Sequence, residues 1–184
     1  WMLDTYLSTL RPQERNRSLH VVTGKPVELG GSVGRDKATG QGIVFMIERW
    51  AEDRGFDLAE ATYFVQGFGN VGAWAARLMK PLGAKLVAVE DVSGAVANKD
   101  GIDPDKLAAH VLENGVVEGY PGTVPVDHEA FMASEADIFI PAALENQITA
   151  ETAPLIKVAL VAEGANGPTD LDGGKILREK GVEV

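Results

Sequence analysis

The sequence predicts an α/β fold with a doubly wound parallel sheet, and two observations carry this prediction. Four short apolar segments typical of buried strands, at 62–66, 85–89, 136–140 and 158–162, alternate with segments of helical periodicity. The first of these strands runs directly into a glycine-rich turn that opens a helix. Strands that alternate with helices favour right-handed βαβ units, in which a parallel sheet is covered on both faces.

The other elements can be assigned in chain order. Residues 1–10 form a short amphipathic helix, and the glycine-rich stretch 21–34 is a loop before a long helix at 36–52. That long helix carries an apolar stripe made of Ile43, Phe45, Met46, Ile47 and Trp50. The remaining elements are a helix at 71–82, an extended piece at 95–97 followed by a turn at 98–101, helices at 104–113 and 171–180, and a short extended end at 182–184.

Length and charge narrow the possible functions. A chain of 184 residues is enough for one domain with a sizeable core. Its 17 basic and 27 acidic residues give a net charge of −10, which repels a phosphate backbone and argues against nucleic acid or an anionic membrane as partner. There is no cysteine, no apolar run of membrane-spanning length and no signal peptide, so a cytoplasmic location is expected.

The glycine-rich turn has the residues and the context of a dinucleotide site. Gly67 permits a tight turn, Gly69 lets the backbone approach a pyrophosphate, and Gly72 lets the helix pack closely on the strand. The N-terminus of the helix then supplies N–H groups and the positive end of the helix dipole. Glu90 ends the second strand, 18 residues beyond Gly72, where a carboxylate can accept from ribose hydroxyls. The alternative is an ordinary strand-to-helix turn whose glycines serve packing alone.

Three further segments follow predicted strands. They are the pair Glu90-Asp91 and the stretches 141–147 and 162–169, each a turn of small residues with one or two acids or amides. Parallel strands of such a sheet bind ligands at their carboxyl ends, so we expect these turns to lie at one edge with the glycine turn. Turn chemistry alone is the alternative for each of them.

Several stretches together resemble glutamate dehydrogenase, of the glutamate, leucine, phenylalanine and valine dehydrogenase family, in its C-terminal NAD-binding domain. The matching stretches are 1–6, 21–26, 30–42, 66–72, 141–148 and 162–169, which extend over nearly the whole chain. The resemblance implies a Rossmann-like dinucleotide-binding domain. Leucine and phenylalanine dehydrogenases share the fold and the glycine motif, but the run Ala-Leu-Glu-Asn-Gln at 143–147 is more similar to the glutamate enzyme.

The resemblance implies a reaction and an assembly. The family oxidises L-glutamate reversibly to 2-oxoglutarate and ammonia and passes a hydride to a nicotinamide, in a parent enzyme expected to be a homohexamer. Residues 1–184 would be a single dinucleotide-binding domain with a helical lead-in at 1–20, without the N-terminal substrate domain and the final helices. No lysine here fits the family's catalytic context, so no catalytic residue is assigned, and the chain is expected to bind cofactor without turnover. The alternatives are the cofactor domain of a leucine- or phenylalanine-type enzyme and a non-catalytic NAD-sensing or assembly module.

The resemblance also assigns cofactor-binding residues. Arg35 and Thr39 would lie at the nicotinamide end, Ala142 and Ala143 would pass under the cofactor, and Asn166 would orient the nicotinamide ribose. The residues implied for the pyrophosphate and adenosine are Gln66, Gly67, Phe68, Gly69, Asn70, Val71 and Gly72. The alternatives are a helix-capping role for Thr39 and a turn amide for Asn166.

Glu90 and Asp91 predict NAD in preference to NADP. A carboxylate accepts a hydrogen bond from the ribose 2′-hydroxyl of NAD but faces a charged phosphate in NADP. Like charges about 4 Å apart repel by about 4 kcal/mol at an effective dielectric constant of about 20, before screening by salt. Glu90 is the expected contact because it stands at the strand end. The run Asp127-His128-Glu129 is assigned to a solvated loop and not to a metal, because three adjacent side chains diverge.

Overall fold

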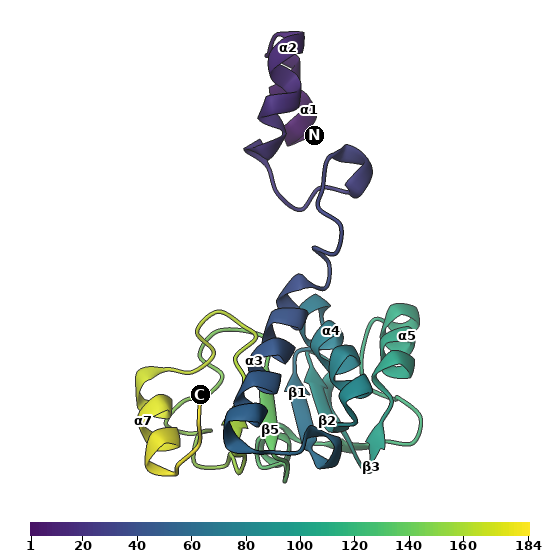
Figure 1. Cartoon of the computed structure of the whole chain (residues 1–184). Coiled ribbons are helices and arrows are strands. Elements are labelled where there is room, and N and C mark those ends of the chain that lie inside the picture. The colour runs from purple at the N-terminus through teal and green to yellow at the C-terminus, as the bar shows by residue number, and fades with distance from the viewer. The chain divides into compact units, whose positions relative to one another are not determined.

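The computed structural model describes all 184 residues, and the chain divides into two compact units, Trp1–Ala38 and Thr39–Val184 (Figure 1). No helix in either unit is both long enough and apolar enough to cross a membrane.

The first unit consists of short helices and turns. Its helices are α1 (Met2–Ser8), α2 (Pro12–Arg15) and the 3-10 helices η1 (Asn16–Val21) and η2 (Val27–Leu29), and none of them contains a buried residue. The expected helix at 1–10 is therefore confirmed in a shorter form. The Lys25 ammonium ties the following loop together, because it donates to the carbonyl oxygens of Leu19, at 2.7 Å, and Val22.

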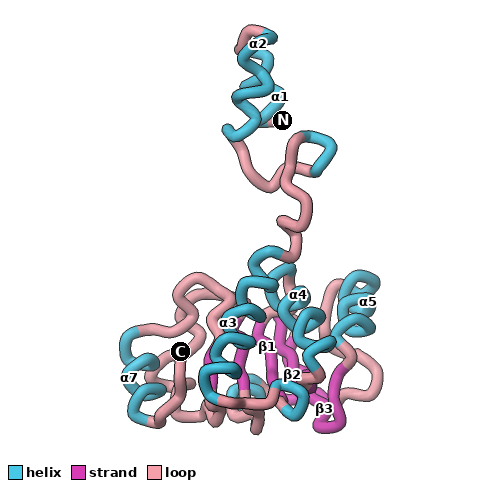
Figure 2. Tube along the Cα trace, viewed as in Figure 1, coloured by secondary structure: helices cyan, strands magenta, loops and turns pink.

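The second unit is built on a six-stranded sheet in the order β4-β3-β2-β1-β5-β6. Strands β1, β2, β5 and β6 are parallel, while β3 is antiparallel to β2 and β4 is antiparallel to β3. The strands are β1 (Thr62–Gln66), β2 (Lys85–Asp91), β3 (Gly94–Ile102), β4 (Val124–Val126), β5 (Ile138–Pro141) and β6 (Leu160–Val161). The predicted α/β fold is thus confirmed, with β3 and β4 added in antiparallel orientation at one edge of the parallel strands. Figure 2 shows the strands in magenta among the helices in cyan.

Helices cover both faces of the sheet. One face packs against α3 (Ala38–Arg54), α4 (Asn70–Met79) and α5 (Pro104–Asn114), and the other packs against α6 (His128–Met132) and α7 (Leu171–Glu179). Two more 3-10 turns, η3 (Leu58–Glu60) and η4 (Lys80–Leu82), lead into β1 and β2. Each face has its own apolar cluster, so the sheet is the common wall of two cores.

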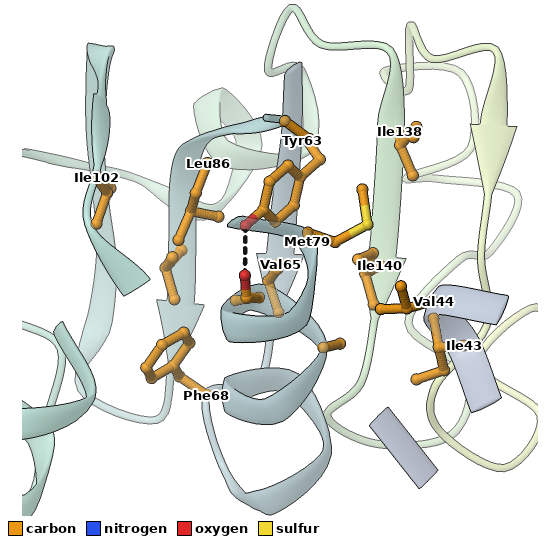
Figure 3. Close-up of a cluster of buried hydrophobic side chains, with 14 of the residues drawn as sticks. Ile43, Val44, Tyr63, Val65, Phe68, Met79, Leu86, Ile102, Ile138 and Ile140 are labelled. Carbon is orange, nitrogen blue, oxygen red and sulfur yellow. Dashed lines mark hydrogen bonds between the residues drawn. The ribbon is translucent and has the colours of Figure 1, made fainter. Parts of the chain in front are cut away.

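The first of these cores fixes α4 on β1. Tyr63 and Val65 of β1, Met79 of α4 and Ile140 of β5 are fully buried in it (Figure 3). The Tyr63 hydroxyl donates a hydrogen bond of 2.9 Å to the carbonyl oxygen of Ala76, the dashed line in Figure 3. This bond sets the position of α4, and with it the turn that precedes the helix.

Two details differ from the sequence prediction. The extended piece at 95–97 was expected to end in a turn at 98–101, which is wrong, because β3 continues to Ile102. Residues 98–101 form a bulge in this strand, between the pairs Ala88↔Ala97 and Leu86↔Ile102. The backbone N–H of Asp100 donates to Oδ1 of Asn98 at 2.9 Å, so the local turn is present but lies within the bulge of β3. The loop expected at 127–129 instead opens α6, where the Asp127 carboxylate accepts from the N–H of Ala130 at 2.7 Å as the N-cap.

Candidate dinucleotide site

The carboxyl ends of the parallel strands meet at one edge of the sheet. Gln66, the last residue of β1, is paired with Glu90 of β2 on one side and with Pro141 of β5 on the other. The turns after β5 and β6 are joined by backbone bonds, from the N–H of Gln147 to the oxygen of Pro168 at 2.7 Å and from that of Gly164 to the oxygen of Pro141 at 2.9 Å. The expectation that the four turns share an edge is confirmed.

The three glycines of the turn have different surroundings. Gly67 has a φ of +87°, and a Cβ there would stand 2.7 Å from the backbone of Ala143. A Cβ on Gly72 would overlap the carbonyl oxygen of Gly67, so only glycine lets α4 approach this closely. Gly69 differs from both, because its φ is −75° and a Cβ there would meet nothing within 4 Å. Gly67 and Gly72 are therefore needed for the turn and for packing, while Gly69 leaves its side of the turn open.

A cavity of about 540 Å³ lies against this turn. Most of the residues expected to bind cofactor line it, namely Gln66, Gly67, Phe68, Gly69, Glu90, Asp91, Ala142 and Ala143. The α4 helix begins at its rim with Gly69 as N-cap, and no side chain caps the helix there. Backbone N–H groups and the positive end of a helix dipole at a cavity rim form an arrangement suited to an anion such as a phosphate.

The other expected residues lie outside this cavity. Asn70 lines a smaller neighbouring hollow of about 220 Å³ with Trp74 and Arg77, and Val71 and Gly72 continue the first turn of α4. Thr39 is exposed in the first turn of α3, and Asn166 is exposed in the turn after β6. Arg35 belongs to the first unit, where it lines a hollow of about 400 Å³ with Lys25 and Ser32.

Glu90 is held from two sides by the protein itself. One carboxylate oxygen accepts from the Gln66 amide at 2.9 Å, and the other is 2.8 Å from Nδ1 of His128 on α6. The same Gln66 amide donates to Gln147 at 3.0 Å, which links β1, β2, α6 and the turn after β5. The Glu90 side chain is only 12% exposed and yet lines the cavity.

Asp91, next to Glu90 in β2, binds the backbone of the segments that follow this strand. One of its oxygens accepts from the N–H of Ser93 at 2.7 Å and from its hydroxyl at 2.5 Å, which closes the turn between β2 and β3. The other oxygen accepts from the N–H of Val117 at 2.9 Å. Asp91 therefore fixes the wall of the cavity beyond the end of β2.

His128, assigned to a solvated loop from the sequence alone, lies beside the cavity on α6. It precedes no recognisable motif and lies 38 positions from Glu90 along the chain. Only the packing of α6 against β2 and β3 through Phe131 and Met132 brings its ring to the carboxylate. No local pattern in the sequence carries that information.

Comparison with known proteins shows which family the chain belongs to. The profile of the glutamate/leucine/phenylalanine/valine dehydrogenases matches residues 30–184, which is most of the chain. The chain belongs to this family of amino-acid dehydrogenases. The recognised resemblance to glutamate dehydrogenase is therefore confirmed at the level of the family.

Solved structures of this family share the fold. The hetero-hexameric glutamate dehydrogenase from Thermus thermophilus, in a leucine-bound form, is 33% identical over 90% of this chain with a TM-score of 0.83. The glutamate dehydrogenase from Peptoniphilus asaccharolyticus is 37% identical over 87% of this chain with a TM-score of 0.69. The L-tryptophan dehydrogenase from Nostoc punctiforme, at 24% identity over 81% of this chain and a TM-score of 0.60, shares the fold alone. The chain spans only 39%, 36% and 41% of these three proteins, respectively.

Proposed function

We propose that the chain is the dinucleotide-binding domain of a glutamate dehydrogenase and that it binds NAD in preference to NADP. The observation that carries the proposal is the glycine turn, in which Gly69 alone is free of any packing reason to be glycine. A site that must admit a pyrophosphate close to its backbone explains that glycine, whereas a turn built only for packing does not. The adjoining cavity, lined by an acid at the end of β2, fits the rest of such a cofactor.

The residues of the chain would divide the binding between them. The N–H groups at the start of α4 would hold the pyrophosphate, Ala142 and Ala143 would leave room beneath the cofactor, and Thr39 and Asn166 would orient the nicotinamide and its ribose. Arg35 is proposed for the nicotinamide end because of the resemblance to glutamate dehydrogenase. When bound, the nicotinamide supplies the hydride acceptor. The protein's part is to hold the ring in a fixed orientation, since hydride transfer depends on the alignment of the reacting carbons.

For the parent enzyme we propose reversible oxidative deamination of L-glutamate to 2-oxoglutarate and ammonia. The relatives from Thermus thermophilus and Peptoniphilus asaccharolyticus, at 33% and 37% identity, are glutamate dehydrogenases, which supports glutamate over leucine or phenylalanine as substrate. The parent is proposed to be a homohexamer, and the 184-residue chain is proposed to bind cofactor without turnover. Formation of NADH that depends on glutamate, with the purified chain alone, would contradict this last part.

The test of cofactor binding is the variant Gly69→Ala. The added methyl group meets no atom within 4 Å, so only the exchange of glycine for alanine at the N-cap of α4 should affect stability. The melting temperature should stay within about 4 °C of the parent chain, as a change of about 1 kcal/mol would produce. The methyl group would stand where the pyrophosphate approaches, so the affinity for NADH measured by calorimetry should fall at least about tenfold.

Gly42→Ala is the matched control. Gly42, on α3, is equally open to an added Cβ but lies outside the cavity, so its substitution should leave NADH affinity unchanged. Equal affinities for the parent chain and both variants would mean that the open side of Gly69 serves no pyrophosphate. Failure of the parent chain to bind either NADH or NADPH would refute the proposed function of the chain.

A further inference from the structure

The strongest unassigned feature is the contact between Glu90 and His128. The carboxylate lines the proposed dinucleotide cavity, at the end of β2 where the adenosine ribose would lie, and the imidazole approaches it from α6 at 2.8 Å. His128 is 52% exposed and is the first residue of its helix, so its ring is in contact with solvent. Gln66, the other partner of the carboxylate, carries no charge. The charge that this carboxylate presents to a ligand therefore depends on the state of one histidine.

The other charged groups near His128 do not replace it as the charged partner of Glu90. On α6 the Asp127 carboxylate is engaged as N-cap, and Glu129 is exposed beside it. From β2 the facing group is Glu90 itself. β3, the other strand that packs against α6, contributes the uncharged Ala95 and Ala97 to the shared apolar cluster.

We propose that His128 is a positioning residue that holds the Glu90 carboxylate at the ribose end of the cavity and makes rejection of a 2′-phosphate depend on pH. The inference rests on the proposed function, because it concerns which dinucleotide the same cavity accepts. With a neutral imidazole, Glu90 presents a full negative charge and repels a ribose 2′-phosphate. With a protonated imidazole, the pair is neutral overall and the repulsion falls. Histidine is the side chain whose charge ordinarily changes between pH 5 and 8, so discrimination between NAD and NADP should weaken on acidification.

The test is calorimetric titration of the 184-residue chain with NAD and with NADP, in their oxidised forms, at about pH 5.5 and about pH 8. The measured quantity is the ratio of the two dissociation constants. For the parent chain the preference for NAD should fall on the order of tenfold from the higher to the lower pH. In His128→Gln the side chain does not titrate, so the fall should be smaller than in the parent chain.

The ligand itself requires a control, because the second pKa of a phosphate monoester is about 6. The free ligand titrates in the same way in both experiments, so the difference between the parent chain and the variant reports on His128. His20→Gln, which removes a histidine of the first unit, should behave as the parent chain does. Glu90→Gln should relax the preference at the higher pH and remove its dependence on His128.

Two results would overturn the inference while the proposed function stands. In one, NAD binds but the parent chain and His128→Gln show the same change of preference with pH. In the other, Asp91→Asn relaxes the preference and Glu90→Gln does not, which would assign the discrimination to Asp91. If NAD binds under neither condition, the proposed function itself is wrong, and the inference with it.

Discussion

Tyr63 shows how a single buried residue ties the sheet to the helix that opens the site. Its side chain is fully buried in the first core, and its hydroxyl donates to the carbonyl oxygen of Ala76 in α4. Burial raises the pKa of the Tyr63 hydroxyl above its ordinary value of 10.0, because an ionised phenolate would lose its hydration inside the core. The folded chain therefore keeps this proton at a pH where the unfolded chain loses it.

The variant Tyr63→Phe tests both the hydrogen bond to Ala76 and the raised pKa of the hydroxyl. Near pH 8 it should lower the free energy of unfolding by about 1 kcal/mol, the usual net value of a buried hydrogen bond. Because the pKa of Tyr63 is higher in the folded than in the unfolded chain, its protonated hydroxyl contributes its full stability below the pKa of the unfolded chain. Above that pKa the free energy of unfolding of the parent chain falls by about 1.4 kcal/mol per pH unit. By about pH 11 the gap between parent and variant should therefore close, as urea unfolding at both pH values would show. A gap that stays constant with pH would contradict the assigned shift.

At the scale of one element, α4 depends on Gly72 for its distance from β1. A Cβ at this position would overlap the backbone oxygen of Gly67 and stand 3.0 Å from Cγ1 of Val65, and neither atom belongs to a flexible side-chain end. Gly72→Ala should therefore lower the free energy of unfolding by about 1–3 kcal/mol, as overpacking does. Urea unfolding measures this, with Gly69→Ala, in the same turn, as the matched variant that should cost less because its Cβ meets no atom within 4 Å. Equal stabilities of the two variants would show that α4 shifts to accept the methyl group.

The elements themselves differ in how far the sequence could predict them. β1 was predicted to the residue, because an apolar run ending in a glycine motif has few alternative structures. On α3, Ile43 and Ile47 are buried as the apolar stripe requires, but Phe45 is 60% and Met46 69% exposed. Successive residues turn by about 100° around a helix axis, so Phe45 cannot share a face with Ile43, and apolar composition alone suggested a stripe that periodicity does not support.

Contacts between distant elements were beyond the sequence. The pairing of β4 with β3 and the packing of α6 against the sheet join segments that no single pattern in the sequence connects. The same holds inside the candidate site. Its glycine turn and the acids of β2 could be read from the sequence, whereas the bonds that join Glu90 to Gln66 and His128 come only from folding.

At the scale of the whole molecule, stability resides in the second unit. No residue before Gly40 is buried, whereas Thr39–Val184 contains both apolar clusters and the entire sheet. Segments without buried apolar contacts open locally at little cost in free energy, and proteases cut such segments first.

Limited trypsin digestion of the native chain should therefore cleave first within residues 1–38. Cleavage after Lys37 would leave a fragment that begins at Ala38, the first residue of α3. Since this fragment retains both cores, it should resist further digestion and melt within a few degrees of the intact chain. Mass spectrometry of the digest identifies the cut sites, and the same digestion in urea shows that the later lysines and arginines can be cut once the sheet unfolds. Early native cleavage after Lys99 or Lys106 would mean that the edge of the sheet around β3 and α5 opens more readily than the N-terminal unit.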